Sequence, residues 1–242
     1  MTGAMMQHVL SLTRRCIQDY DMIQPGDGVA VGLSGGKDSL LLTLALTRLR
    51  AFYPVPFSLR AIAVDLGFPN TDFSGPARFC REIDLPFSVV KTNIAQIVFD
   101  IRKESNPCAL CAKMRRGVLH RAAAESDCRT VALGHHYDDA VETALINLLF
   151  EGRFASFQPV SYLDRAGLRL IRPFLYVEEH SIVPQARQLP VVKSPCPVDG
   201  HTKRQEVKAL LETLSKTYPQ IKTRIFNALR KLPDWKMPES TG

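Results

Sequence analysis

The chain has 242 residues, of which 45% are hydrophobic and 23% charged, as in ordinary soluble globular proteins. No apolar run approaches the ~20 residues of a membrane-spanning helix, and the N-terminus lacks the unbroken apolar stretch of a secretion signal. We therefore expect a cytoplasmic protein with no membrane partner. The 31 Lys and Arg residues against 24 Asp and Glu give a net charge of +7, which fits a polyanionic partner and fits a merely basic protein as well.

Short apolar runs alternate with segments of helical periodicity along the chain. The expected strands cover residues 28–33, 59–66, 87–90, 130–133 and 168–171. The expected helices cover residues 5–20, 40–50, 72–83, 111–125, 138–150 and 177–188, with a charged helical segment over 202–232. This alternation predicts an α/β fold with a parallel sheet and helices on both faces. We expect one domain over 1–193 and a small C-terminal helical extension over 194–242.

The turn after the first strand has the composition of an anion site. It reads Ser34-Gly35-Gly36-Lys37-Asp38-Ser39 and leads into a helix. Glycines let backbone N–H groups converge on phosphate oxygens, and a helix N-terminus adds positive potential. Two hydroxyls and the Lys37 charge add further donors. The residue order differs from the common P-loop and from the dinucleotide-binding fingerprint.

This string resembles the pyrophosphatase loop of the N-type ATP pyrophosphatases. The resemblance implies that the chain binds ATP with Mg²⁺ and transfers AMP to a substrate oxygen. The residues expected to contact the nucleotide are Ser34, Gly35, Gly36, Lys37, Asp38 and Ser39. We also assign catalytic roles to Lys37, which would stabilise developing phosphate charge, and to Asp38.

Asp65 lies at the end of the second expected strand. Its carboxylate could face the adenosine moiety, as the resemblance suggests, or it could simply serve as a turn residue. Both interpretations remain open.

A second polar turn follows the strand over 130–133 and reads Gly134-His135-His136-Tyr137-Asp138-Asp139, with Glu142 four residues after Asp138. Acids at a helix start are favoured by the helix dipole, which explains one of them without catalysis. The string is similar to the G-H-x-x-D-D-x-x-E-T segment of the thiolating pyrophosphatase-loop enzymes. That similarity implies nucleotide contacts from Gly134 and His135, and an acid–base or Mg²⁺ role for Asp139. His136 receives no role.

Cysteines supply the third motif. Cys108-Ala109-Leu110-Cys111 has a spacing used by redox dithiols, zinc sites and iron–sulfur clusters. No second C-x-x-C completes a four-cysteine zinc site. Cys196, held between prolines, has the most similar setting elsewhere in the chain. The remaining cysteines, expected to be buried small hydrophobes, are Cys16, Cys80 and Cys128.

The chain resembles the tRNA 2-thiocytidine synthetase (tRNA-cytidine 2-sulfurtransferase) family from about Gly28 to Leu232. The resemblance rests on Cys108, Cys111, the helix over 114–117, and Cys196 followed by a basic helix. This resemblance implies a [4Fe-4S] cluster held by the three cysteines, with one iron open to carry sulfur. It also implies 2-thiolation of a tRNA pyrimidine, with cytidine as the expected base. The implied partners are tRNA, a cysteine desulfurase or other sulfur donor, and a second copy in a homodimer.

Basic residues on the helix over 111–125 and in the C-terminal segment could grip tRNA phosphates. The C-terminal ones include Lys203, Arg204, Lys208, Lys216 and Lys222. Each of them, taken singly, also fits a solvated helix face.

One departure from the resemblance concerns Arg115, because some related thiolases carry lysine four residues after the second cysteine. Two other functions also remain open. An adenylating ligase resembling tRNA lysidine synthetase would use the Ser34–Ser39 loop but not the cysteines. A non-catalytic zinc-binding RNA module would use the cysteines but not the loop.

Overall fold

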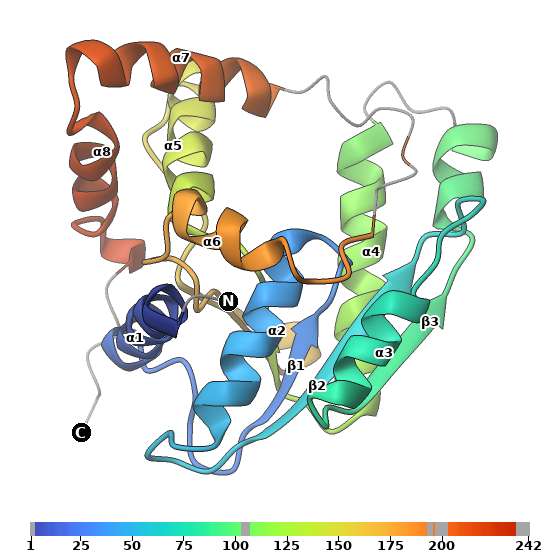
Figure 1. Cartoon of the computed structure of the whole chain (residues 1–242). Coiled ribbons are helices and arrows are strands. Elements are labelled where there is room, and N and C mark those ends of the chain that lie inside the picture. Colours follow the sequence, from blue (N-terminus) through green and yellow to red (C-terminus); the bar gives the residue numbers. More distant parts are fainter. Residues whose placement is uncertain (1–2, 103–106, 193–195, 197–202, 236–242) are drawn as a thin grey trace.

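The computed structural model of the chain describes residues 3–102, 107–192, 196 and 203–235. Six strands form one sheet in the order β3-β2-β1-β4-β6-β5 (Figure 1). The strands are β1 Gly28–Gly32, β2 Ser58–Asp65, β3 Phe87–Lys91, β4 Thr130–Ala132, β5 Val160–Leu163 and β6 Leu168–Ile171. The first four strands and β6 pair in parallel, as predicted. The sequence prediction missed β5, which pairs with β6 as an antiparallel edge strand, so the sheet is mostly rather than purely parallel.

Helices connect most of these strands. The α-helices are α1 Gly3–Asp19, α2 Lys37–Arg50, α3 Ser74–Glu82, α4 Pro107–Glu125, α5 Tyr137–Glu151, α6 Glu179–Ala186, α7 Lys203–Thr217 and α8 Ile221–Leu229. The shorter elements are a π-helix η1 Gln96–Arg102 and two 3-10 turns, η2 Asp164–Ala166 and η3 Pro233–Trp235. The structure corrects the start of α4, which begins at Pro107 rather than near Cys111, in keeping with the preference of proline for the first helical position. None of these described helices is long and apolar enough to cross a membrane.

The two faces of the sheet bury different side chains because successive strand residues point in opposite directions. On β1, Val29 and Val31 belong to the larger hydrophobic core with α1, α2 and α5, whereas Ala30 belongs to a smaller one with η1 and α4. The prediction of helices on both faces is therefore confirmed.

The C-terminal helices α7 and α8 lie beside α5 and share the larger core (Figure 1). Val207 and Leu211 of α7 are almost completely buried, as are Phe226 and Leu229 of α8. The ring of Phe226 lies 4.4 Å, centroid to centroid, from that of Tyr137 at the start of α5. Helices α7 and α8 are thus packed onto the same helix that follows the second polar turn.

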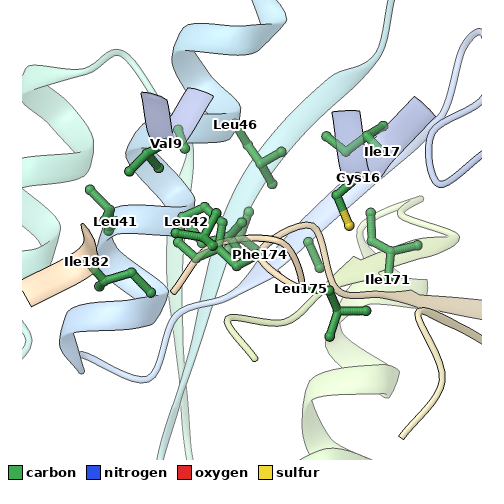
Figure 2. Close-up of a cluster of buried hydrophobic side chains, with 14 of the residues drawn as sticks. Val9, Cys16, Ile17, Leu41, Leu42, Leu46, Ile171, Phe174, Leu175 and Ile182 are labelled. Carbon is green, nitrogen blue, oxygen red and sulfur yellow. The ribbon is translucent and has the colours of Figure 1, made fainter. Parts of the chain in front are cut away.

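Phe174, which follows β6, lies at the centre of the larger core with Leu41, Leu42 and Leu46 of α2 (Figure 2). We expect Phe174→Ala to lower the free energy of unfolding by about 3–5 kcal/mol, because it removes a large buried side chain and leaves a cavity. Urea unfolding followed by circular dichroism measures this loss. Phe52→Ala is the matched control, since Phe52 is 55% exposed, and equal losses for the two variants would contradict the assignment of this core.

Candidate active site

The two polar turns meet because their strands are neighbours. β1 and β4 pair in parallel at the point where the strand order reverses, so the loops that follow them leave the same edge of the sheet. A Cβ added to Gly134 would lie 3.1 Å from both the carbonyl carbon of Asp38 and the amide nitrogen of Ser39. Gly134 therefore allows the second turn to approach the backbone of the first.

The loop after β1 forms a compact turn held by its own serines. Gly35 adopts a left-handed conformation, with φ of +86°, which glycine accepts readily. The hydroxyls of Ser34 and Ser39 lie 3.0 Å apart, and the amide of Ser34 donates to the Ser39 hydroxyl at 3.1 Å. The Ser39 hydroxyl also lies 3.0 Å from the Gly36 carbonyl oxygen, to which it donates. The turn is thereby fixed at the N-terminus of α2, where backbone amides favour an anion.

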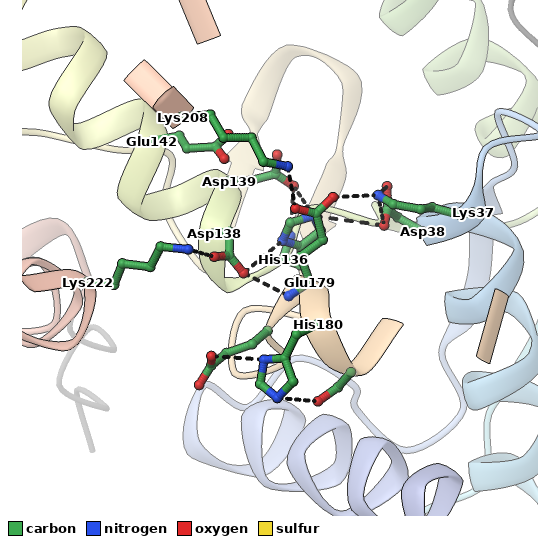
Figure 3. A network of polar contacts seen from close by, with 12 residues as sticks. Lys37, Asp38, His136, Asp138, Asp139, Glu142, Glu179, His180, Lys208 and Lys222 are labelled. Atoms are coloured by element: carbon green, nitrogen blue, oxygen red, sulfur yellow. Dashed lines mark hydrogen bonds and ion pairs between the residues drawn. The ribbon is translucent and has the colours of Figure 1, made fainter. Parts of the chain in front are cut away.

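Lys37 opens α2 and is already paired with carboxylates. Its Nζ lies 2.9 Å from Oδ1 of Asp38 and 3.1 Å from Oε1 of Glu179, the first residue of α6 (Figure 3). Burial works against the charged lysine, but hydrogen bonds and charge from Asp38 and Glu179 raise its pKa above the ordinary value. Lys37 is therefore a fixed positive charge beside the loop. Sequence reasoning missed Glu179, which no local motif singled out.

The second turn enters α5 through a set of acids gathered around His136. The His136 amide donates to Oδ2 of Asp139 at 3.0 Å and so caps the helix. Its imidazole Nε2 lies 3.5 Å from Asp139 and 3.8 Å from Asp38, while its Nδ1 lies 3.9 Å from Asp138. His136, which has no role in the sequence analysis, thus lies among three carboxylates on two different helices. Only its place just before the acids could have signalled this.

Cations from the C-terminal helices neutralise these acids (Figure 3). NH1 of Arg204, on α7, lies 3.1 Å from Asp139 and 2.9 Å from Glu142. Nζ of Lys222, on α8, lies 2.7 Å from Asp138. Although burial opposes it, hydrogen bonds from the Glu179 amide and Lys222 lower the pKa of Asp138. Burial raises the pKa of Glu142 in spite of Arg204.

Arg204, Lys208 and Lys222, which we expect to contact tRNA phosphates, are each paired with a carboxylate of the site. Their contact with tRNA stays a prediction. Lys216, by contrast, is exposed at the far end of α7. Of the basic side chains of α7, Arg204 and Lys208 therefore face the site, whereas Lys216 faces the solvent.

His135 lies beside a buried arginine. Its ring is 4.9 Å, centroid to centroid, from that of Phe157, which the guanidinium of Arg172 also covers at 5.1 Å. Burial, helped by the charge of Arg172, lowers the pKa of His135 from its ordinary value of 6.5 to about 4. Its Nδ1 has no hydrogen-bond partner among the described residues. His135 is thus a neutral side chain with a nitrogen available for an additional contact.

Asp65 ends β2 and makes a local contact. Its Oδ1 accepts a hydrogen bond from the Gly67 amide at 2.9 Å, as expected for a turn residue. A contact with the adenosine moiety stays a prediction.

Two cysteines of the expected cluster, Cys108 and Cys196, influence the pKa of the third, Cys111. Cys108 is exposed and Cys111 half-buried in the first turns of α4, and Cys196 is half-buried. Burial raises the pKa of the Cys111 thiol, the nearby Arg115 lowers it, and Cys196 and Cys108 raise it further. Both other thiols are therefore close enough to act on Cys111. No three His, Cys, Asp or Glu side chains in the described ranges are already gathered as a metal-binding group.

The donor chemistry of these thiols suits an iron–sulfur cluster, which thiolates hold. Val192, before Cys196, is also tied to the Ser34–Ser39 loop (the phosphate loop), because its amide donates to the carbonyl of Gly35 at 2.9 Å. The remaining cysteines Cys16, Cys80 and Cys128 are buried, as predicted.

Comparisons with known proteins agree with this arrangement. Residues 7–193 match a family model described as a PP-loop domain. The tRNA-cytidine(32) 2-sulfurtransferase of Geobacter sulfurreducens is 38% identical over 220 residues, which are 89% of this chain and 86% of that protein. The protein of the same name from Syntrophotalea carbinolica is 36% identical over 226 residues, 91% of this chain and 87% of that one. Among solved structures, the U34-tRNA thiolase NcsA from Methanococcus maripaludis with its [4Fe-4S] cluster is similar, with a TM-score of 0.73 and 26% identity over 93% of this chain and 79% of that one.

We expect Gly134→Ala to weaken ATP binding by about tenfold, because its methyl group would push the second turn away from the backbone of Asp38 and Ser39. Isothermal titration calorimetry measures the dissociation constant. Gly117→Ala on α4 is the control, since a Cβ there meets nothing within 4 Å. Unchanged affinity in Gly134→Ala would show that the two turns need not touch.

The low pKa of His135 gives a pH dependence with a definite sign. A neutral histidine buried in the folded state stabilises the protein fully above pH 6.5, and this stability is lost as the pH falls from 6.5 towards 4. At pH 5 we expect a loss of about 1–2 kcal/mol through this residue. The ionisable side chains that face it are Arg172, Asp139, Arg204 and His136.

Urea midpoints of the wild type and His135→Gln, measured from pH 7.5 to 5, test this expectation. The variant should lose less stability than the wild type over that interval. Parallel curves would mean that His135 does not carry the acid sensitivity.

Proposed function

This chain belongs to the tRNA-cytidine 2-sulfurtransferase family of PP-loop proteins, and from that premise we propose that it replaces the C2 oxygen of a tRNA pyrimidine by sulfur in an ATP-dependent reaction. The expected base is cytidine, the one named for the relatives of this chain. The observation that carries the proposal is the presence, in one fold, of the Ser34–Ser39 loop and three neighbouring thiols.

The first half of the reaction activates the oxygen. A pyrimidine C2 carbonyl is a poor electrophile because oxide is a poor leaving group. Its oxygen attacks the α-phosphorus of ATP, the bond to the β-phosphate breaks and pyrophosphate leaves, so AMP becomes attached to the C2 oxygen. Lys37 and the loop amides stabilise the charge that develops on the phosphates. Asp38 and Asp139 are the residues that would hold Mg²⁺, which screens phosphate charge when bound.

The proposal includes further nucleotide contacts. Gly134 lets the second turn reach the loop, and His135 contributes a neutral nitrogen to the nucleotide. Asp65, at the end of β2, would contact the adenosine side. His136 lies within 4 Å of Asp38 and Asp139, where it orients both carboxylates.

The second half transfers sulfur. Cys108, Cys111 and Cys196 would hold a [4Fe-4S] cluster, which would supply the sulfur that replaces the C2 oxygen. Sulfide attacks C2, the C–O bond breaks, and AMP leaves with the original oxygen, so the products are the C=S base, AMP and pyrophosphate. Burial raises the pKa of Cys111, and the charge of Arg115 only partly offsets that rise.

The proposal extends to partners and organisation. The enzyme would act on tRNA in the cytoplasm, receive sulfur from a cysteine desulfurase or another donor, and work as a homodimer. Residues 1–193 would form the PP-loop domain with its N-terminal helix, and residues 194–242 the C-terminal extension that carries the third cysteine. The most direct test is nucleoside analysis of tRNA from cells with and without the gene, in which a missing 2-thiopyrimidine is the supporting result and an unchanged nucleoside profile the contradicting one.

Anaerobic purification separates this function from the two alternatives. Brown protein with broad visible absorbance supports the thiolation enzyme. Colourless protein that still releases pyrophosphate supports an adenylating ligase. Colourless protein that contains zinc and binds no nucleotide supports an RNA-binding module.

A pair of substitutions divides the reaction into its two halves. Cys196→Ala should lose the cluster, measured as iron content and visible absorbance, and keep ATP binding within about twofold. Asp38→Ala should keep the brown colour and lose adenylation by more than about a hundredfold, measured as pyrophosphate release. The controls are Cys128→Ala, at a buried cysteine far from the motif, and Asp164→Ala, at an exposed acid beside the amino end of β6. Full cluster content in Cys196→Ala, or normal thiolation by Asp38→Ala, would remove that residue from its proposed role.

A further inference from the structure

Glu179 holds two lysines from distant parts of the chain. Its Oε1 lies 3.1 Å from Nζ of Lys37, the lysine of the phosphate loop, and its Oε2 lies 2.6 Å from Nζ of Lys208 on α7 (Figure 3). Each carboxylate oxygen thus accepts from one ammonium group. The Glu179 carboxylate lies between two ammonium groups, where another anion could bind in its place. It neutralises only one of the two lysines, so Glu179, Lys37 and Lys208 together carry a net charge of +1.

We propose that Lys208 is a second phosphate-binding lysine of the nucleotide site, and that Glu179 is an internal counter-ion which the triphosphate of ATP displaces. The inference rests on the proposed function only in requiring that the chain binds ATP. It assigns a ligand to a residue outside all three sequence motifs, 171 residues beyond Lys37.

The geometry allows this exchange without movement of the backbone. The Glu179 amide is held by Oδ2 of Asp138 at 2.7 Å, so the start of α6 stays in place while the carboxylate rotates. The Glu179 side chain is 25% exposed and that of Lys208 46%, so both have solvent-facing room. On α7, the neighbouring Val207 is buried in the core and fixes the helix.

Electrostatic interactions also favour displacement of the Glu179 carboxylate by a triphosphate. Although burial opposes it, hydrogen bonds from Lys208 and Lys37 hold the pKa of Glu179 at about 2, so the carboxylate is ionised at neutral pH. A triphosphate presents more charge and more acceptor oxygens than one carboxylate, and ammonium groups bind phosphate through charge-assisted hydrogen bonds. Arg204, one helical turn before Lys208, also faces the site, where it binds Asp139. This face of α7 therefore points towards the place where phosphates and metal would be held.

Calorimetric titration of the full-length, anaerobically purified protein with ATP tests the inference, once in EDTA and once with Mg²⁺. We expect Lys208→Gln to weaken ATP binding about tenfold in EDTA, and Lys208→Arg to restore most of the affinity. Glu179→Gln should bind ATP several-fold more tightly in EDTA than the wild type, because the competing anion is gone. Lys216→Gln, which removes an exposed lysine from the same helix, should match the wild type.

Two results would overturn the inference. Lys208→Gln with the affinity of Lys216→Gln would show that Lys208 does not contact the nucleotide. Weaker binding by Glu179→Gln, in EDTA or with Mg²⁺, would make Glu179 a supporting residue or metal ligand rather than a competitor. Melting temperatures of all variants identify misfolding, and rescue by Lys208→Arg excludes it as the cause. A wild-type protein that binds no ATP would refute the proposed function as well, whereas a change confined to the variants concerns this inference alone.

Discussion

Acidic side chains of α2 and α5 lie together at the edge where β1 and β4 end, and the cations that face them make this possible. Asp138 and Glu142 are each 5% exposed, and buried carboxylates are costly unless they are paired and hydrogen-bonded. Their partners are Lys222 and Arg204, from the last quarter of the chain. The polar centre of the enzyme is therefore assembled from two strand ends and two helices far away in sequence.

This pairing changes how the C-terminal helices are understood. Their apolar sides join the core through residues such as Leu211 and Phe226, while their cations reach the acids of α5. The hydrogen bond that the Val192 amide donates to the Gly35 carbonyl ties the preceding segment to the Ser34–Ser39 loop. An extension in the sequence thus serves as one wall of the site, and the loop, the acids and the third cysteine are linked through the same stretch of chain.

Much of this arrangement could be predicted from local patterns. Short apolar runs that alternate with helical segments predicted the parallel strands. The placement of Ser34–Ser39 and Gly134–Asp139 directly after strands predicted that the two turns meet at one edge of the sheet. The short edge strand β5 was not predicted, because its four residues with mixed burial show no clear periodicity. The contacts of Glu179, Lys208 and His136 could not be predicted for another reason. In the sequence, a lysine on an amphipathic helix has the same pattern whether its side chain contacts water or a carboxylate from another helix. Such pairing depends on tertiary packing, which residue spacing does not encode.

The late position of Arg204 and Lys222 in the chain also affects the order in which the protein folds during translation. A polypeptide emerges from the ribosome N-terminus first, and its early parts can fold while later ones are still being made. α2 and α5 are therefore available long before Arg204 and Lys222 exist, and until then Asp138 and Glu142 lack these partners. The nascent sheet can form its apolar contacts early, but the polar centre closes only when α7 and α8 arrive. Asp138 and Glu142 thus gain these charged partners only after the ribosome has made α7 and α8.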